Sequence, residues 1–195
     1  MVLVTCVLCV ARQFVWVDYH CTIAISRSKM VSSLVVRPAV PEDASIICGL
    51  VQELADFEKM PDGPRVTMEQ TAEHIRNKVF QGFLAMDGET PAGMLLFYFA
   101  YSTWKGPFVH MEDLYVRPQY RRQRVGLRLW TELGKFGVKN NLPRIEWDVL
   151  DWNVNAIKFY EKMEATNMHK AEGWLKYRLT EEGIDRLAHF LDNKQ

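Results

Sequence analysis

The segment from residue 109 to residue 138 constrains the fold more than any other part of this 195-residue chain. Residues 109–116 have the composition of a strand, and a short basic loop leads from them directly into a helix pattern at residues 124–138. In open α/β sheets, ligands bind where a strand passes through a tight loop into a helix. We therefore expect the chemistry to lie at the loop of residues 117–124.

The remaining patterns predict one α/β domain in which helices flank a sheet. Ile47, Leu50 and Leu54 share one face of an amphipathic helix. Thr67 and Gln70 have the spacing of a helix capping box, and Asp87-Gly88 is a hairpin turn signal. Further strands are expected at residues 34–37, 83–86, 92–99, 145–150 and 174–179, and helices at residues 42–58, 67–79, 155–163 and 180–191.

Charge and composition argue against several classes of partner. Lys+Arg and Asp+Glu number 24 each, whereas nucleic-acid binding normally requires a basic excess. No apolar run reaches the roughly 20 residues that span a bilayer. Cys48 is the one cysteine after residue 29, which is typical of a reduced compartment, and His74 and His110 lack metal-ligand spacing. We expect a cytoplasmic protein with no nucleic-acid, membrane or metal partner.

Residues 1–29 are expected to be a poorly ordered extension, and residues 30–195 to form the folded domain. Met30 stands just before the first strand pattern and is the expected natural start. The alternative is a transit peptide, because the segment is poor in acidic residues, although its basic residues number only three. Cys6 and Cys9 form a C-x-x-C pair without a second pair at zinc spacing, so unpaired thiols are expected.

The loop before the long helix has the features of an anion site. Successive backbone N–H groups at a helix N-terminus bind anions, and the flanking arginines add positive charge. The expected ligand is a pyrophosphate, and the alternative is a solvated basic loop. The loop also resembles the coenzyme A signature of the GNAT superfamily, R/Q-x-x-G-x-G/A, with Arg121, Arg124 and Gly126 at the defined positions. Arg124 replaces the first glycine of the signature. Either its Cβ impedes the approach of the backbone to the phosphate, or its guanidinium itself contacts a phosphate.

Other segments make the resemblance more specific. They are ELADFE at 53–58, YSTWKG at 101–106, MEDLYV at 111–116, LDWN at 150–153, FY at 159–160 and EGW at 172–174. With these segments, residues 34–180 resemble the spermidine/spermine N-acetyltransferase family, and especially its thialysine acetyltransferase branch. Glu164 is a second departure, because the family usually has glycine there.

The resemblance implies a GNAT fold, with a mixed, mainly antiparallel sheet whose central strands splay apart. It also implies a homodimer that transfers acetyl from acetyl-CoA to a small primary amine by direct attack. The implied coenzyme A contacts are Leu114, Tyr115, Val116, Arg121, Arg122, Gln123, Arg124, Val125, Gly126, Leu127, Asn153, Ala156 and Tyr160. The implied acceptor-side residues are Phe57, Glu58, Ser102, Trp104, Glu112, Glu146, Trp147, Asp148, Glu172 and Trp174.

The implied catalytic residues suit the chemistry. An alkyl ammonium has a pKa near ~10.4, so only about 0.1% is free amine at neutral pH, and a carboxylate must accept its proton. Glu112 is the candidate base, and the alternative is a strand-edge salt bridge. Main-chain N–H groups near Tyr115 are expected to stabilise the oxyanion. Tyr160 is the expected acid for the leaving thiolate, since a phenol keeps its proton at neutral pH; the alternative is an ordinary half-buried tyrosine.

The acceptor is predicted from charge and aromatic residues. Trp104, Trp147 and Trp174 are expected to box an alkyl ammonium, although each is equally compatible with ordinary packing. Polyamine-specific relatives carry aspartate in place of Ser102, which favours a thialysine-like amino acid over spermidine here. Two other functions stay open: a protein or peptide N-acetyltransferase, and a coenzyme A-binding regulator without catalysis.

Overall fold

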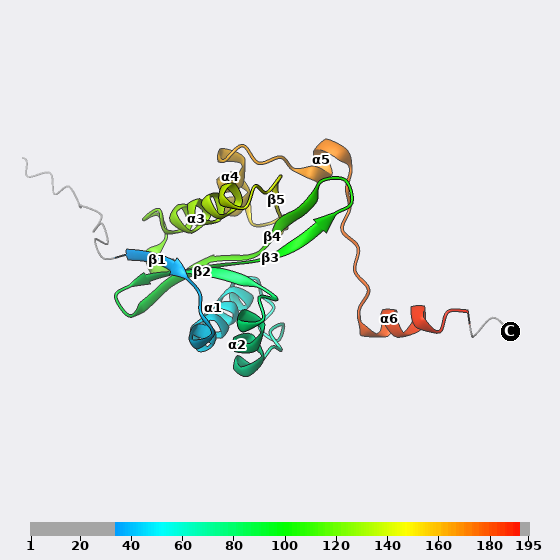
Figure 1. Cartoon of the computed structure of the whole chain (residues 1–195), viewed down its shortest axis with the longest axis horizontal. Helices are drawn as coiled ribbons and strands as arrows, with labels where there is room; N and C mark the ends of the chain where they lie inside the picture. Colours follow the sequence, from blue (N-terminus) through cyan, green and yellow to red (C-terminus); the bar gives the residue numbers. More distant parts are fainter. Residues whose placement is uncertain (1–33, 192–195) are drawn as a thin grey trace, which may run out of the picture.

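A computed structural model describes residues 34–191 (Figure 1). Its five strands form one sheet in the order β1-β2-β3-β4-β5, and β5 runs parallel to β4 while all other neighbours are antiparallel. This is the mixed, mainly antiparallel sheet that the sequence predicts. The predicted extension of residues 1–29 lies outside the described residues. The strands are β1 (Leu34–Pro38), β2 (Gln81–Asp87), β3 (Thr90–Ser102), β4 (Gly106–Val116) and β5 (Ile145–Trp147).

Helices cover both faces of the sheet, as Figure 1 shows. α1 (Ala44–Phe57) and α2 (Met68–Arg76) lie on one face, and α3 (Val125–Lys139) and α4 (Val154–Lys162) lie on the other. Successive residues of a strand point to opposite faces. Leu96 of β3 therefore packs in the α1–α2 core, whereas Phe97 packs in the α3 core.

Local sequence signals set several element boundaries. Thr67 Oγ1 accepts the N–H of Gln70 at 3.2 Å and Gln70 Oε1 accepts the N–H of Thr67 at 2.9 Å, which confirms the capping box at the start of α2. Gly88 adopts φ 59° in the predicted hairpin turn between β2 and β3. α2 ends earlier than predicted, at Arg76, with Asn77 as its C-cap.

The C-terminal segments differ most from the prediction. β5 ends at Trp147 rather than at residue 150. No strand forms at residues 174–179; a short helix α5 (Met168–Glu172) precedes this segment instead. An alternating pattern becomes a strand only where a sheet edge pairs with it, and here the chain leaves the body (Figure 1).

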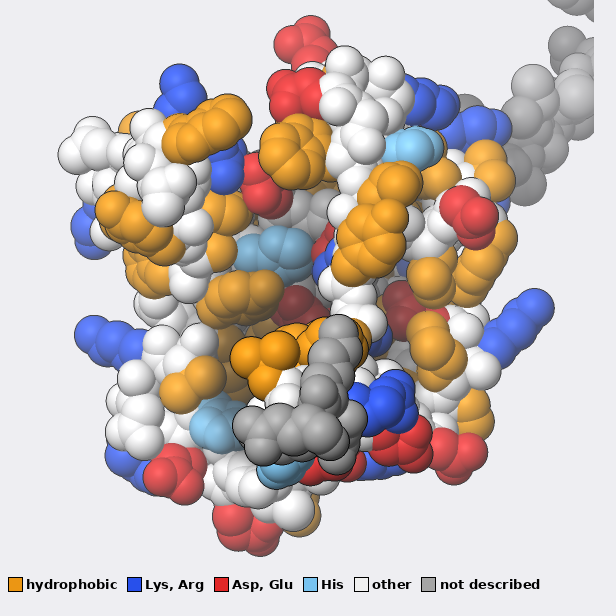
Figure 2. All heavy atoms as spheres, turned by 90° about the vertical axis from the view of Figure 1, so that its right-hand side faces the viewer, with side chains coloured by type: hydrophobic (Ala, Val, Ile, Leu, Met, Phe, Trp, Pro, Cys, Tyr) orange, Lys and Arg blue, Asp and Glu red, His pale blue; other side chains and the backbone are white. Residues whose placement is uncertain are grey.

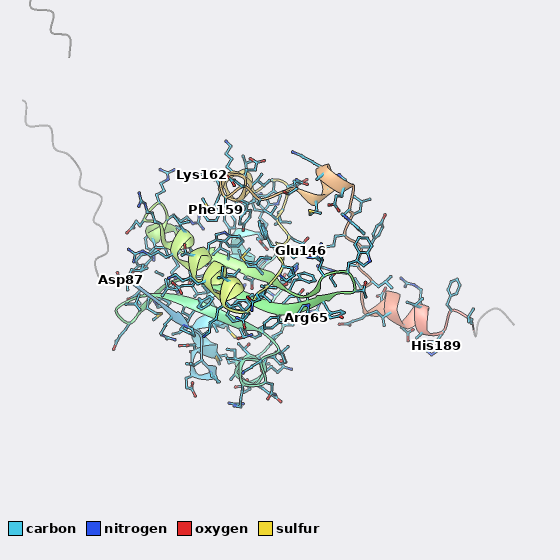
Figure 3. All side chains as sticks on the ribbon, turned by 45° about the horizontal axis from the view of Figure 1, so that its top comes forward. Arg65, Asp87, Glu146, Phe159, Lys162 and His189 are labelled. Carbon is cyan, nitrogen blue, oxygen red and sulfur yellow. The ribbon has the colours of Figure 1, made fainter. Side chains whose placement is uncertain are left out.

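We call residues 173–191 the C-terminal arm. It ends in α6 (Glu181–Ala188), which stops three residues before the predicted end, and the predicted cap Thr180 makes no side-chain hydrogen bond to it. Figure 3 shows His189, just after α6, far from Glu146 and Phe159 of the body. Between Leu34 and Leu191, none of the helices combines the length and the apolar character needed to cross a membrane.

Candidate active site

β4 and β5 separate where the predicted site lies. β5 pairs with β4 only at Val109, His110 and Met111, whereas β4 itself continues to Val116. Beyond Met111, this edge of β4 has no strand neighbour within residues 34–191. Main-chain N–H and C=O groups on such an edge are available to a ligand. This is the splayed arrangement expected from the sequence, and it places Leu114, Tyr115 and Val116 along the opening.

A β-bulge at Glu112 changes which side chains face the acceptor side. Asp113 pairs with Leu96 and Met111 pairs with Phe97, so Glu112 is an extra residue in β4. Before the bulge, His110 pairs with Tyr98 on the α1–α2 face. Strict alternation would place Asp113 on the α3 face, but the bulge turns it to the α1–α2 face. Sequence reasoning therefore missed Asp113 as a site residue.

Asp113 is the most strongly perturbed carboxyl of the site. Burial raises its pKa most, the charges of Glu112 and Glu58 act in the same direction, and together they move it from 3.8 to about 7. Burial also raises the pKa of Glu58, which is the C-cap residue of α1. Glu58 and Glu112, both predicted site residues, are thus close enough to Asp113 for their charges to raise its pKa. Together with Asp113 they form an acidic group at the end of the opening.

The raised pKa of Asp113 predicts a pH-dependent stability. Between pH 4 and pH 7 the folded protein holds this proton while the unfolded chain has lost it, so the stabilisation is complete below pH 4 and lost as pH rises through 7. Asp113→Asn should remove this loss, which we place on the order of 2 kcal/mol for a half-buried group.

Urea unfolding at pH 5 and pH 8 measures the effect of Asp113→Asn. The variant should lose less stability than the wild type between these two pH values. Asp62→Asn, at an exposed position, is the control and should change nothing. Equal losses in the wild type and in Asp113→Asn would show that Asp113 is ionised in the folded protein already at pH 5.

A second polar group surrounds His110. Its Nε2 lies 3.8 Å from Glu112 Oε2 and 3.7 Å from Asp148 Oδ2, and its ring is 5.1 Å from that of Tyr98. Lys176 of the C-terminal arm donates to Asp148 Oδ2. We call these five residues the His110 cluster. Figure 2 shows the right-hand side of the molecule of Figure 1, which has a hollow with histidine and acidic side chains inside and hydrophobic side chains at the rim.

Tyr160 lies on the other side of the opening, on α4. Asn153 Oδ1 accepts the N–H of Ala156 at 3.3 Å and so caps α4, which fixes the helix that carries Tyr160. The phenol ring packs 4.9 Å from Trp147 of β5. Burial raises the pKa of Tyr160 to about 12. Within residues 34–191 its hydroxyl has no hydrogen-bond partner, so a protonated donor is available to a ligand.

The basic loop is braced against the body. Arg117 donates from Nη2 to Glu53 Oε1 at 2.6 Å and from Nη1 to Pro91 O at 2.8 Å, which ties the loop to α1 and to the start of β3. Arg121 donates to Val116 O at 2.9 Å and its guanidinium lies over the Phe57 ring. The guanidinium groups of Arg122 and Arg124, by contrast, have no ion-pair partner in the described part of the chain.

The start of α3 suits an anionic ligand. Arg124 is the N-cap residue of α3, but its side chain accepts no hydrogen bond from the first turn. The first N–H groups of the helix therefore receive no side-chain cap from Arg124. A Cβ at Gly126 would meet only Val116 Cγ2, at 3.7 Å, so packing within the protein does not require this glycine. Gln123 Oε1 is buried and has no partner among the described residues. Loop and helix start therefore fit a pyrophosphate and its flanking polar groups.

Both positions where the chain lacks an expected glycine have left-handed backbones. Arg124 has φ 63° and Glu164 has φ 61°. A side chain in this region costs roughly 1–2 kcal/mol. Arg124→Gly should therefore raise Tm by a few degrees, since about 1 kcal/mol shifts a domain of this size by about 2–4 °C. Removal of a guanidinium at an anion site should also weaken acetyl-CoA binding several-fold.

Glu164→Gly is the matched control for Arg124→Gly, because it relieves the same backbone cost outside the loop. Differential scanning fluorimetry and calorimetric titration with acetyl-CoA measure both variants. Similar gains in Tm are expected, with weaker binding only in Arg124→Gly. Unchanged binding in Arg124→Gly would show that Arg124 does not contact phosphate.

Several predicted acceptor residues lie away from Glu112. Ser102 and Trp104 are at the tip of the β3–β4 hairpin, where Ser102 Oγ accepts the N–H groups of Trp104 and Lys105 at 3.2 and 3.3 Å. Glu112 is six residues along β4 from Gly106, roughly 20 Å at 3.3 Å per residue. The structure does not bring these residues together within one chain, and the role of Ser102 stays a prediction.

Three more predicted acceptor residues, Glu146, Glu172 and Trp174, form their polar contacts with residues outside the acidic group of Glu58, Glu112 and Asp113. Glu146 of β5 forms an ion pair with Arg144 at 2.8 Å. Trp174 Nε1 donates to Glu172 Oε2 at 2.8 Å, and the Trp174 side chain is exposed on the arm. Figure 3 shows that Glu146 lies on the same side of the molecule as Phe159 and Lys162 of α4.

Residues 50–164 match the acetyltransferase (GNAT) family, and this match covers the second half of α1, the opening between β4 and β5, the basic loop and Tyr160. The chain belongs to the GNAT acetyltransferase family. It is therefore an acetyl-CoA-dependent N-acetyltransferase. The resemblance noted in the sequence is confirmed at the family level.

Relatives and solved structures agree with this family. A thialysine N-epsilon-acetyltransferase of Caenorhabditis elegans is 45% identical over 148 residues, which is 76% of this chain and 92% of the relative. The Bos taurus enzyme of the same name is 31% identical over 165 residues, and the match covers 80% of this chain and 97% of the relative. The fold matches that of an aminoglycoside acetyltransferase from a soil metagenomic sample with a TM-score of 0.66. The two sequences are 18% identical, and the match covers 76% of this chain and 96% of the other.

Proposed function

We propose that this GNAT enzyme acetylates the terminal primary amine of a small molecule, in particular an amino acid of the thialysine type. The observation that carries the proposal is the acidic group of Glu58, Glu112 and Asp113 at the opening between β4 and β5, opposite the neutral phenol of Tyr160. Carboxylates on the acceptor side attract a cationic amine, and a phenol across the opening can protonate a thiolate. Relatives named thialysine N-epsilon-acetyltransferase support the acceptor class.

Each residue has a defined task in the proposed reaction. Acetyl-CoA supplies the acetyl group as a thioester, held along β4 at residues 114–116 and by the loop that ends at Leu127. Glu112 accepts the proton of the ammonium, directly or through water, and the free amine then forms the N–C bond as the C–S bond breaks. Main-chain N–H groups near Tyr115 stabilise the carbonyl oxygen. Tyr160 Oη gives its proton to the thiolate, the nitrogen loses its second proton as the amide forms, and this proton returns through water to the Tyr160 oxygen; no acyl-enzyme is formed.

The electrostatics of the two sides support this division of tasks. With a pKa of about 12, the Tyr160 hydroxyl stays protonated throughout the neutral pH range and can donate. Asp113, with a pKa of about 7, is a reserve proton acceptor beside Glu112. The wide difference between the pKa values of the phenol and the carboxyl groups matches an acid on one side and a base on the other.

Turnover with acetyl-CoA and a panel of acceptors tests the proposal. The panel contains thialysine, lysine, ornithine, spermidine and a lysine-containing peptide, and free thiol release is followed. Thialysine is expected to give the highest kcat/KM. A preference for the peptide would indicate a protein N-acetyltransferase, and binding of acetyl-CoA without any turnover would indicate a regulator; either result would refute the proposed function.

We also infer a homodimer with the C-terminal arm at its interface. The arm carries large hydrophobic side chains that are more than half exposed in a single chain, and a second copy would cover them. Sedimentation of the full chain tests this inference: two copies are expected, and a monomer at micromolar concentration would contradict it. The exposed residues are Trp174, Leu175, Tyr177, Leu179, Ile184, Leu187, Phe190 and Leu191.

A further inference from the structure

Two carboxylates of the His110 cluster lie close enough together for one lysine-type molecule to reach both. Glu112 Oε2 and Asp148 Oδ2 both lie within 3.8 Å of His110 Nε2. They are therefore at most about 8 Å apart, and a lysine analogue, whose side-chain and α-nitrogen atoms are joined by six bonds of about 1.5 Å each, is long enough to reach from one to the other. An acceptor whose reacting amine lies near Glu112 thus reaches Asp148 with its far end.

The far end of the site carries both signs of charge. Asp148 follows β5 directly, and Lys176 of the C-terminal arm donates to it. In the single chain these side chains remain 53% and 59% exposed, so both are accessible to a ligand there. The α-carbon of a free amino acid also carries both signs, an ammonium and a carboxylate. A polyamine or a simple diamine carries only positive charge there.

We propose that Asp148 and Lys176 form a subsite for the α-amino acid group of the acceptor. Asp148 binds the α-ammonium and Lys176 binds the α-carboxylate, while the reacting amine lies beside Glu112. This inference rests on the proposed function and deepens it, because it assigns the choice between amino acids and diamines to two residues. Lys176 lies within the polar group around Glu112, whereas Ser102, the residue that the sequence suggests for this task, lies at the hairpin tip.

The surroundings of the pair agree with a binding role. The charges of Glu112, Asp148 and Lys176 all act on the hydroxyl of Tyr98, whose pKa is raised mainly by burial. The pair therefore lies beside the candidate base rather than on a remote surface. Glu146, the carboxylate within β5, is held in an ion pair by Arg144 and does not compete for the ligand.

Two acceptors that differ by one group test the role of Lys176. Thialysine and bis(2-aminoethyl) sulfide have the same chain, but only thialysine carries the α-carboxylate. Lys176→Met should lower kcat/KM for thialysine by about 10-fold and leave the diamine nearly unchanged. Lys176→Glu should move the preference to the diamine, and Lys176→Arg should restore the preference for thialysine. Lys135→Met, which breaks the exposed ion pair with Glu132 on α3, is the control and should leave the ratio unchanged.

α-N-Acetyl-thialysine tests the role of Asp148, because it lacks the α-ammonium. Asp148→Asn should lower kcat/KM for thialysine and for the diamine by about 10-fold, and should leave the α-N-acetylated acceptor nearly unaffected. Equal losses on all three acceptors would overturn the inference, since they would mean that the pair only holds the arm in place. A wild-type enzyme that acetylates no amine would instead refute the proposed function, and this inference with it.

Discussion

Tyr160→Phe is expected to lower kcat by roughly 100- to 10,000-fold, the usual contribution of a positioned general acid. The substitution removes only the hydroxyl and keeps the ring that packs against Trp130 and Trp147. Within residues 34–191 this hydroxyl has no hydrogen-bond partner, so folding and acetyl-CoA binding should be unchanged. The loss should therefore appear in kcat and not in the Kd for acetyl-CoA.

Single-turnover rates and calorimetric titration separate these two quantities. With a pKa of about 12, Tyr160 remains protonated up to about pH 11, so the wild type should show no loss of the acid below that pH. Tyr101→Phe, at an exposed position on β3, is the matched control and should retain full activity. A Tyr160→Phe enzyme with the wild-type rate would remove Tyr160 from the mechanism.

Glu112→Gln is expected to lower kcat/KM by roughly 100-fold or more at pH 6–7, with a smaller loss at pH 9. The reason is that the free amine is scarce at low pH and a base must generate it, whereas at high pH the solution already supplies it. The substitution also removes one of the charges that raise the pKa of Asp113, so Asp113 should titrate at lower pH in the variant.

The pH–rate profile from pH 6 to pH 10 measures the effect of Glu112→Gln. The double variant Glu112→Gln with Asp113→Asn shows whether Asp113 replaces the lost base, and a further loss is expected if it does. Glu132→Gln, at a partly exposed carboxylate on α3 outside the site, is the control. A Glu112→Gln profile with the shape and height of the wild type would mean that Glu112 is structural.

Local signals in the sequence account for much of the fold. The capping box of Thr67 and Gln70 and the hairpin turn at Gly88 depend on residues within a few positions of one another, so adjacent residue types suffice to predict them. The strand, basic loop and helix around the candidate ligand site were predictable for the same reason. The two missing glycines at Arg124 and Glu164 were visible in the sequence, but their left-handed φ angles were not.

Other features of the site depend on partners that are distant in the sequence. The bulge at Glu112 exists only in the pairing of β4 with β3, and it places Asp113 beside Glu112 and Glu58. The ion pair of Asp148 and Lys176 joins residues 28 positions apart.

The segment 174–179 has the alternation of a strand but does not form one in the single chain. Register, burial and ion pairing depend on which segments meet in space, and the alternation of one strand does not specify its neighbour. The sequence by itself therefore determined the family and most of the elements, while the tertiary structure decided whether the segment 174–179 pairs as a strand and which charged groups lie together at the candidate site.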